Sequence, residues 1–277
     1  MTFGERLARA FDTRGHLCVG IDPHSFLLQE WGLTDDAAGV REFGLRVVEA
    51  TASRAAIIKP QVAFFERHGS AGFAALEEVL AAARAAGLLV IGDAKRGDIG
   101  STFDGYAEAW LTPGSPLEVD ALTVSPFLGI GSVEGPRGLA LDNDKGLFVL
   151  AATSNPEAAG LQLAREDRGL TVAASIVERV HDWNGTTGRL GDVGLVIGAT
   201  LDVSAYEIAD EHLVTTPILA PGFGSQGARF GDIRDIFGAA SGNVVVSASR
   251  SILAAGPDEI AHAITSQAAE VAGAFAA

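Results

Sequence analysis

The chain of 277 residues is predicted to fold as a single (β/α)8 TIM barrel with an extra N-terminal helix. Eight short apolar runs rich in β-branched residues recur along the sequence, and alanine-rich stretches with helical spacing separate them. Strands that alternate with helices form a parallel sheet, and eight such units in about 250 residues are typical of a closed barrel. Because no Pro/Gly/Ser-rich linker interrupts the pattern, residues 1–277 are expected to form one domain.

The predicted strands are near-continuous apolar runs, as expected for a sheet that is covered on both faces. In chain order they occupy residues 16–22, 55–61, 88–95, 119–125, 146–153, 193–200, 215–222 and 243–250. Among the helical stretches between them, residues 72–86 carry Leu76, Val79 and Leu80 at helical spacing. The segment before His16 is expected to close the bottom of the barrel as a helix, and residues 260–277 to form the last outer helix.

Composition excludes several classes of protein. A net charge of -15 argues against a nucleic-acid partner, because such proteins need basic surface to displace counterions from phosphates. The single cysteine, Cys18, allows neither a disulfide nor a cysteine-based metal site. The first residues are mixed and charged, and no apolar stretch approaches the roughly 18 residues that span a bilayer. We therefore predict a cytoplasmic protein with no membrane partner.

The third predicted strand ends in charged residues. Its apolar run leads directly into Asp93 and Lys95, and the two-residue period of a strand puts both side chains on one face. In a partly dry pocket an adjacent carboxylate keeps a lysine protonated, and a protonated lysine can deliver a proton to a carbanion. A surface ion pair at a strand end explains these residues equally well, so the choice depends on their context.

Polar residues also end several of the other runs. Asp22 ends the first, Lys59 the second, Ser125 the fourth and Arg250 the eighth. Each residue alone is explained as a solvated strand end. The carboxyl ends of barrel strands all meet on one face, however, so the repetition favours a shared pocket.

The last two predicted strands lead into an anion-binding pattern. Residues 221–227 read PGFGSQG, and Arg250 follows the eighth run just before a helical stretch. Glycines let backbone N–H groups approach an anion, a helix N-terminus favours negative charge, and arginine can bond two oxygens at once. Loops after strands 7 and 8 commonly bind phosphate in this fold. A plain glycine turn is the alternative, and we predict a phosphorylated substrate.

Together these motifs resemble the orotidine 5'-phosphate decarboxylase family, in its longer-chain branch, over residues 20–252. The most specific is DAKRGDIGST at residues 93–102, which contains an Asp-x-Lys-x-x-Asp signature. Supporting motifs are GIDP at 20–23, IIKPQVAFFE at 57–66, TVSPF at 123–127, PGFGSQG at 221–227 and SASRSI at 247–252. The resemblance implies conversion of orotidine 5'-phosphate to UMP and CO2 in pyrimidine biosynthesis, with no metal or other cofactor.

The same resemblance implies a role for each matching residue. Lys95 is expected to protonate C6 of the pyrimidine, Asp93 to face the carboxylate of the substrate, and Lys59 and Asp98 to complete the charged array. The remaining substrate-binding expectations are Asp22 for the ribose, Ser125 for the pyrimidine, Gln226 and Arg250 for the phosphate, and Ile99 and Thr102 beside Asp98. The resemblance also implies a homodimer with shared active sites, in which Asp98, Ile99 and Thr102 would reach into the active site of the partner subunit.

Two segments depart from the family pattern or vary within it. Ser249 stands where shorter relatives often have glycine, so an unusual backbone angle there would be harder to adopt. Residues 153–156, TSNP, lie in a variable region and are given no role.

Two other functions remain as alternatives. Relatives with the same signature act on sugar phosphates with a magnesium ion, but they need an acidic ligand at the end of the second strand, where this chain has Lys59. A barrel that only binds a nucleotide phosphate would have little use for the costly charges of Lys59, Asp93 and Lys95. The six histidines show no metal-ligand spacing.

Overall fold

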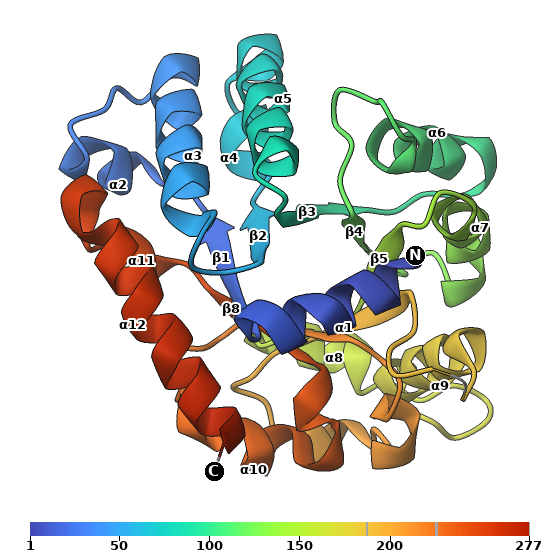
Figure 1. Cartoon of the computed structure of the whole chain (residues 1–277). Coiled ribbons are helices and arrows are strands. Elements are labelled where there is room, and N and C mark those ends of the chain that lie inside the picture. The colour runs from blue at the N-terminus through green and yellow to red at the C-terminus, as the bar shows by residue number, and fades with distance from the viewer. Residues whose placement is uncertain (187, 225–226, 277) are drawn as a thin grey trace.

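The strands of the chain form one closed parallel barrel in the order β1 to β8 (Figure 1). The computed structural model describes residues 1–186, 188–224 and 227–276. The strands are β1 Leu17–Ile21, β2 Ile57–Pro60, β3 Leu89–Arg96, β4 Ala121–Val124, β5 Gly146–Ala152, β6 Val193–Ile197, β7 Ile218–Ala220 and β8 Val244–Ala248. Each strand coincides with one of the eight predicted apolar runs, which confirms the predicted (β/α)8 barrel.

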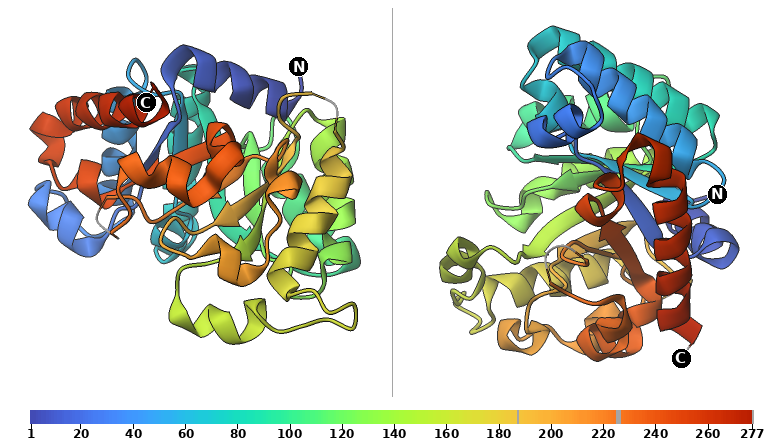
Figure 2. Two further views of the ribbon diagram at one scale, coloured as in Figure 1. Left: turned by 90° about the horizontal axis from the view of Figure 1, so that it is seen from below. Right: turned by 90° about the vertical axis from the view of Figure 1, so that its left-hand side faces the viewer.

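Helices surround the barrel on its outer face (Figure 2). They are α1 Phe3–Arg14, α2 Ser25–Glu30, α3 Ala37–Thr51, α4 Ala63–Glu66, α5 Gly69–Ala85, α6 Gly100–Leu111, α7 Glu134–Asp142, α8 Ala159–Gln162, α9 Val172–Asn184, α10 Ile233–Phe237, α11 Arg250–Leu253 and α12 Gly256–Ala276. The helix expected at residues 72–86 is α5, and the last outer helix is α12, which begins four residues before the predicted start. Gly256 has a φ of 80°, which is the left-handed turn that separates α11 from α12.

Helix α1 lies across one end of the barrel and closes it, as predicted (Figure 1). Thr2 caps the helix, accepting a hydrogen bond from the backbone N–H of Glu5. The apolar face of α1 packs against the inward side chains of the strands, and the rings of Phe3 and Phe148 meet edge to face at 6.0 Å. Gly146 is required there, because a Cβ at this position would lie 2.2 Å from the Phe3 ring.

A charged network at the same end ties α1 to the strands. Arg6 pairs with Asp120, and the second carboxylate oxygen of Asp120 accepts the backbone N–H of Val90 at 2.8 Å. Beside it, Lys145 donates to Glu118 at 2.7 Å. The polar groups at this end of the barrel are thus paired with one another, so this end contributes to the stability of the fold.

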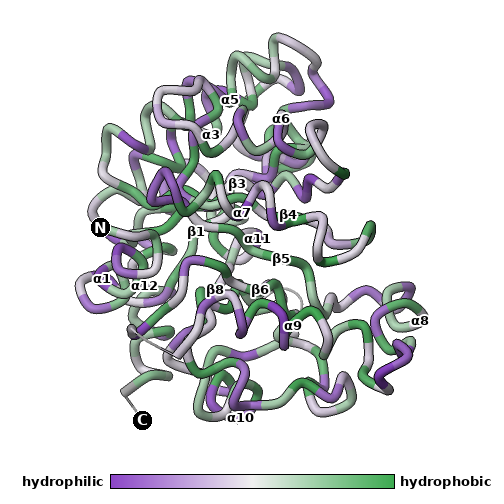
Figure 3. The backbone as a smooth tube through the Cα atoms, turned by 90° about the vertical axis from the view of Figure 1, so that its right-hand side faces the viewer, coloured by the Kyte–Doolittle hydropathy of each residue, from purple (hydrophilic) through white to green (hydrophobic). Residues whose placement is uncertain are grey.

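The apolar residues follow the strands and the inner faces of the helices (Figure 3). Within the described residues, no helix combines the length and the apolar character that crossing a bilayer requires. The opposite end of the barrel, where the strands terminate, holds the polar residues considered next.

Candidate active site

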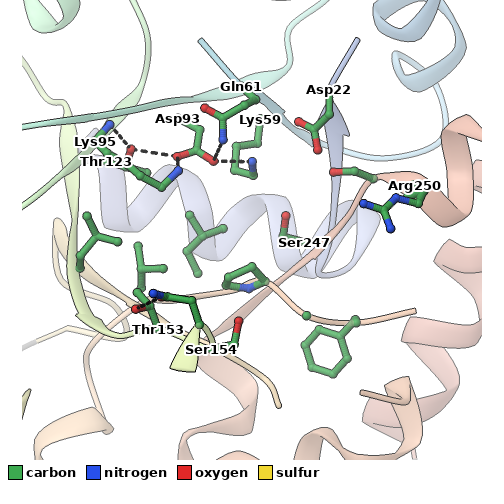
Figure 4. Close-up of a pocket in the computed structure, with 18 of the residues that line it drawn as sticks. Asp22, Lys59, Gln61, Asp93, Lys95, Thr123, Thr153, Ser154, Ser247 and Arg250 are labelled. Carbon is green, nitrogen blue, oxygen red and sulfur yellow. Dashed lines mark hydrogen bonds and ion pairs between the residues drawn. The ribbon is translucent and has the colours of Figure 1, made fainter. Parts of the chain in front are cut away.

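A cavity of about 450 Å³ opens at the carboxyl ends of the strands (Figure 4). Five of the predicted site residues line it, namely Asp22, Lys59, Asp93, Lys95 and Arg250. They come from the ends of β1, β2, β3 and β8, so the closed barrel brings together residues that are up to 228 positions apart in the sequence. The shared pocket inferred from the strand ends is therefore present.

The carboxylate of Asp93 is at the centre of a dense hydrogen-bond network. One oxygen, Oδ2, accepts from Lys59 Nζ at 2.6 Å and from Gln61 Nε2 at 3.0 Å. The other, Oδ1, accepts from Lys95 Nζ and from Thr123 Oγ1, the latter at 3.2 Å. Lys59 and Asp93 are each only 6% exposed. This burial argues against a solvated surface pair, because the carboxylate of Asp93 is enclosed by its donors even though Lys95 is partly exposed.

The electrostatics of the network favour the charged forms of both partners. Burial disfavours a charge on Asp93, but the ammonium groups of Lys59 and Lys95 outweigh it and hold the pKa of Asp93 well below its usual range. Burial likewise disfavours a charge on Lys59, and the carboxylates of Asp93 and Asp22 raise the pKa of Lys59 above its ordinary value. Near neutral pH the pair is therefore ionic.

The backbone at Lys95 differs from the regular strand expected there. Lys95 has a φ of 48°, and the pairing of β3 with β4 shifts register between Gly92 and Arg96. Simple alternation was predicted to put Asp93 and Lys95 on one face. That reason is wrong, since the strand bulges over residues 93–95. The two side chains nevertheless meet, and that of Lys95 remains 46% exposed towards the cavity.

The far side of the cavity has the features expected of an anion site. Arg250 and Asp22 lie on the side of the cavity away from Lys95 (Figure 4). In the part of the chain that the structure describes, no carboxylate lies within ion-pair distance of Arg250. Gly222 and Gly224 have φ angles of 119° and 71°, a conformation that glycine adopts without strain. Gln226, predicted to bind phosphate, lies outside the described residues.

At Ser249 an unusual backbone angle was expected to be difficult, but the residue has a φ of -128° and needs no left-handed conformation. Its side chain fits because Gly20 has none, since a Cβ on Gly20 would lie 1.8 Å from Ser249 Oγ. Gly20, two residues before Asp22, and Ser249, the residue before Arg250, are therefore in close contact. Asp22 itself has one buried carboxylate oxygen, Oδ1, without a hydrogen-bond partner in the described structure.

Four predicted residues do not line this cavity in the single chain. Asp98 follows β3 and accepts the backbone N–H of Ile99 at 2.8 Å, while Ile99 is 62% exposed and Thr102 is exposed on α6. Ser125 is half-buried after β4, where its N–H donates to the Arg96 carbonyl at 2.8 Å.

Several cavity residues were not predicted. Gln61 and Thr123 both donate hydrogen bonds to Asp93. Gln61 lies two residues after Lys59 and Thr123 two residues before Ser125, so the two-residue period of a strand is the signal that could have found them. Thr153, Ser154 and Asn155, which were given no role, also line the cavity. Gln162 holds this loop by accepting the Thr153 N–H at 2.9 Å.

Comparison with known proteins identifies the family. A family model described as "Orotidine 5'-phosphate decarboxylase / HUMPS family" matches residues 15–264. The chain belongs to this family. It is 51% identical over 260 residues to orotidine 5'-phosphate decarboxylase of Salinispora tropica, covering 94% of this chain and 92% of that protein. The Streptomyces coelicolor enzyme of the same name is 53% identical over 257 residues, which cover 92% of this chain and 91% of the relative.

Solved structures agree with this assignment. The orotidine 5'-phosphate (OMP) decarboxylase of Leishmania donovani superposes with a TM-score of 0.80 at 32% identity, and all of each chain is covered. A crystal structure from Streptomyces avermitilis reaches a TM-score of 0.95 at 50% identity, covering 100% of this chain and 96% of the other. The predicted family and fold are thereby confirmed.

Proposed function

We propose that the chain converts orotidine 5'-phosphate to UMP and CO2 in pyrimidine nucleotide biosynthesis, without a metal or other cofactor. The observation that carries the proposal is the array of buried Lys59 and Asp93 with the cavity-facing Lys95, at one side of a cavity whose other side presents Arg250. Full-length similarity to proteins named for this activity supports the same conclusion.

The anionic end of the substrate would bind where the cavity has donors without carboxylate partners. Arg250 and the backbone N–H groups beside Gly222 are suited to a phosphate, since a guanidinium can donate two parallel hydrogen bonds. The unpartnered Oδ1 of Asp22 would accept a hydrogen bond from a ribose hydroxyl, which satisfies a buried acceptor.

The chemistry requires a proton at C6. When CO2 leaves, the electron pair of the broken C–C bond stays on C6 as an sp² carbanion, and Lys95 Nζ delivers the proton that forms the C–H bond. Attraction between the ammonium and the carbanion grows towards the transition state, and at about 4 Å with an effective dielectric of about 20 it is worth about 4 kcal/mol. Asp93 holds Lys95 in place and faces the departing carboxylate.

For the pyrimidine ring, the cavity offers hydroxyl groups other than the one expected. Ser125 lies outside the cavity lining, whereas Ser154 and Thr153 belong to it. We therefore propose that Ser154, and not Ser125, contacts the ring from the loop after β5.

The dimer with shared sites is also a proposal. Ile99, which follows Asp98, and Phe127 and Leu128 are 62%, 72% and 53% exposed on the segments that follow the neighbouring strands β3 and β4. Exposed apolar groups on adjoining segments are typical of an interface. A second copy on this surface would bury them and would place Asp98, Ile99 and Thr102 near the site of the partner.

The remaining predictions on location and partners stay predictions. A cytoplasmic location fits the single free cysteine, which is buried. The absence of a nucleic-acid partner still depends on the net charge of -15.

A direct assay tests the activity and its independence of metal. Consumption of orotidine 5'-phosphate is followed by its ultraviolet absorbance, before and after dialysis against a chelator. We expect turnover at the same rate in both preparations. Absence of turnover would contradict the activity, and turnover that returns only with added magnesium would contradict its independence of metal. Among the described residues, no group of three or more His, Cys, Asp or Glu side chains is placed to hold a metal ion.

A further inference from the structure

We propose that Thr123 is a positioning residue for the decarboxylation, holding the main chain of Lys95 and the carboxylate of Asp93 in one fixed arrangement. The inference rests on the proposed role of Lys95 as the proton donor. The hydroxyl group of Thr123 forms hydrogen bonds with both Lys95 and Asp93, so its place at the cavity is more than a packing contact.

The first observation is the conformation of Lys95. Its φ of 48° is in the left-handed region, which is unfavourable for a residue with a side chain. The other described non-glycine residues with positive φ are Asp144 and Glu207. Asp144 lies in the turn before β5, and Glu207 follows a short 3-10 helix. Lys95 differs from both because it lies inside a strand, so surrounding contacts must hold it there.

The second observation is the pairing of β3 with β4. Ile91 and Gly92 pair with Ala121 and Leu122, and the next paired residues are Arg96 and Val124. Three residues of β3, at positions 93–95, therefore lie opposite the single residue Thr123. This is a bulge, in which the extra residues lose their regular main-chain partners.

The Thr123 hydroxyl replaces the missing ladder bond. Its Oγ1 accepts the backbone N–H of Lys95 at 2.9 Å, and its own hydrogen is directed to Asp93 Oδ1 at 3.2 Å, which is nearer than the Gly92 carbonyl at 3.4 Å. Thr123 is only 1% exposed, so water cannot take over either bond. The hydroxyl thus couples the backbone of the proton donor to the carboxylate that orients its ammonium group.

Valine at this position would fill the same volume without accepting or donating. The Lys95 N–H would lose its acceptor, the strained backbone would relax, and Lys95 Nζ would leave its place beside the reacting carbon. Serine would keep both hydrogen bonds. Arg250 and Asp22, the proposed phosphate and ribose contacts, lie on the other side of the cavity, so their contribution to binding would persist (Figure 4).

The experiment compares Thr123→Val and Thr123→Ser with a matched control, Thr51→Val. Thr51 is also buried and donates to the Val47 carbonyl at 2.7 Å, but it lies in α3 and does not line the cavity. We measure kcat, KM, the Kd of UMP and the melting temperature of each variant. Thr123→Val is expected to lower kcat by about 10- to 100-fold, with KM and Kd changed by less than about threefold. Thr123→Ser should stay within about threefold of wild type.

The control and a crystal structure make the outcome decisive. Thr51→Val should lose stability while keeping the wild-type kcat. The inference is overturned if Thr123→Val keeps the wild-type kcat, or if kcat and UMP affinity fall together. Should the valine variant fail to fold, Thr123→Ala and Thr123→Ser both lose the methyl group, so the ratio of their kcat values measures the hydroxyl alone, and equal values overturn the inference. A crystal structure of the valine or alanine variant with Lys95 still at positive φ and unchanged beside Asp93 would overturn it even if the wild-type chain did not decarboxylate the substrate.

Discussion

Replacing Lys59 with methionine should destabilise the folded state, because the buried carboxylate of Asp93 loses one of its two ammonium partners. The Lys59 Nζ and Asp93 Oδ2 atoms are 2.6 Å apart and both side chains are almost fully buried. At an effective dielectric of about 20, this separation corresponds to an attraction of about 6 kcal/mol, part of which offsets desolvation of the two charges. Breaking a buried pair by removing one partner typically costs about 3–5 kcal/mol, and we expect a loss of this size at pH 7.

The pH dependence of this loss has a defined sign. In the wild type, the pKa of Asp93 is lowered by the neighbouring ammonium groups despite its burial, so its contribution to stability is present above the unfolded pKa and is lost as the pH falls through the folded value. The pKa of Lys59 is raised by the carboxylates despite burial, so its contribution is present below the unfolded pKa and is lost as the pH rises through the folded value. In Lys59→Met, the lowering effect of the Lys59 ammonium is lost while the raising effect of burial remains, so the pKa of Asp93 is higher than in wild type and protonation of Asp93 relieves the variant. The difference in unfolding free energy should therefore shrink as the pH falls from 7 towards 4.

Urea unfolding followed by circular dichroism at several pH values measures this difference. Lys145→Met is a matched control, because Lys145 is equally buried and pairs with Glu118 at 2.7 Å at the closed end of the barrel. Both variants should lose stability, but only Lys59→Met should also lower kcat. A Lys59→Met protein as stable as wild type, or a difference that grows towards acidic pH, would refute the electrostatic reasoning.

Four further outcomes are expected. Lys95→Ala should lower kcat by about 10²–10⁴-fold or more while UMP binding persists, and retained turnover would contradict its role. Arg250→Ala should raise KM by about 10- to 100-fold with a smaller effect on kcat at saturation, which steady-state kinetics measures. An equal mixture of Lys95→Ala and Asp98→Ala chains should recover about a quarter of wild-type activity through one intact site in each hybrid dimer, and no recovery would count against shared sites. Gly20→Ala should weaken substrate binding by pressing on Ser249 Oγ, 1.8 Å from the new Cβ, and Ser249→Gly should restore it in the double variant.

The fold could be predicted from the sequence because its signals are local and repeated. Each strand is an apolar run covered on both faces, so burial shows directly in composition, and all eight were recognised. Helix ends were less predictable. The start of α12 depends on Gly256, whose positive φ is a property of the turn and not of the apolar pattern that indicated a start near residue 260.

The site was predictable to the extent that it follows from strand ends. Asp22, Lys59, Asp93 and Arg250 meet because parallel strands end at one face of the barrel. The period of two puts Thr123 on the same face as Ser125, but its hydrogen bond to Asp93 was not predictable, since it depends on a register shift that the sequence does not reveal. Likewise, only the course of the loops separates Ser154, which lines the cavity, from Ser125, which does not.

The arrangement around Asp93 also explains how Lys95 could leave its partner during the reaction. Turning the ammonium group towards C6 removes one of four donors from a buried carboxylate, a step that would be costly if Lys95 were the only compensating charge. Lys59, Gln61 and Thr123 remain bonded to Asp93, and the attraction of Lys59 at 2.6 Å does not depend on the position of Lys95. In the proposed reaction, the buried lysine would therefore hold the negative charge in place while the exposed lysine gives up its proton, so the two ammonium groups would have different roles despite sharing one carboxylate.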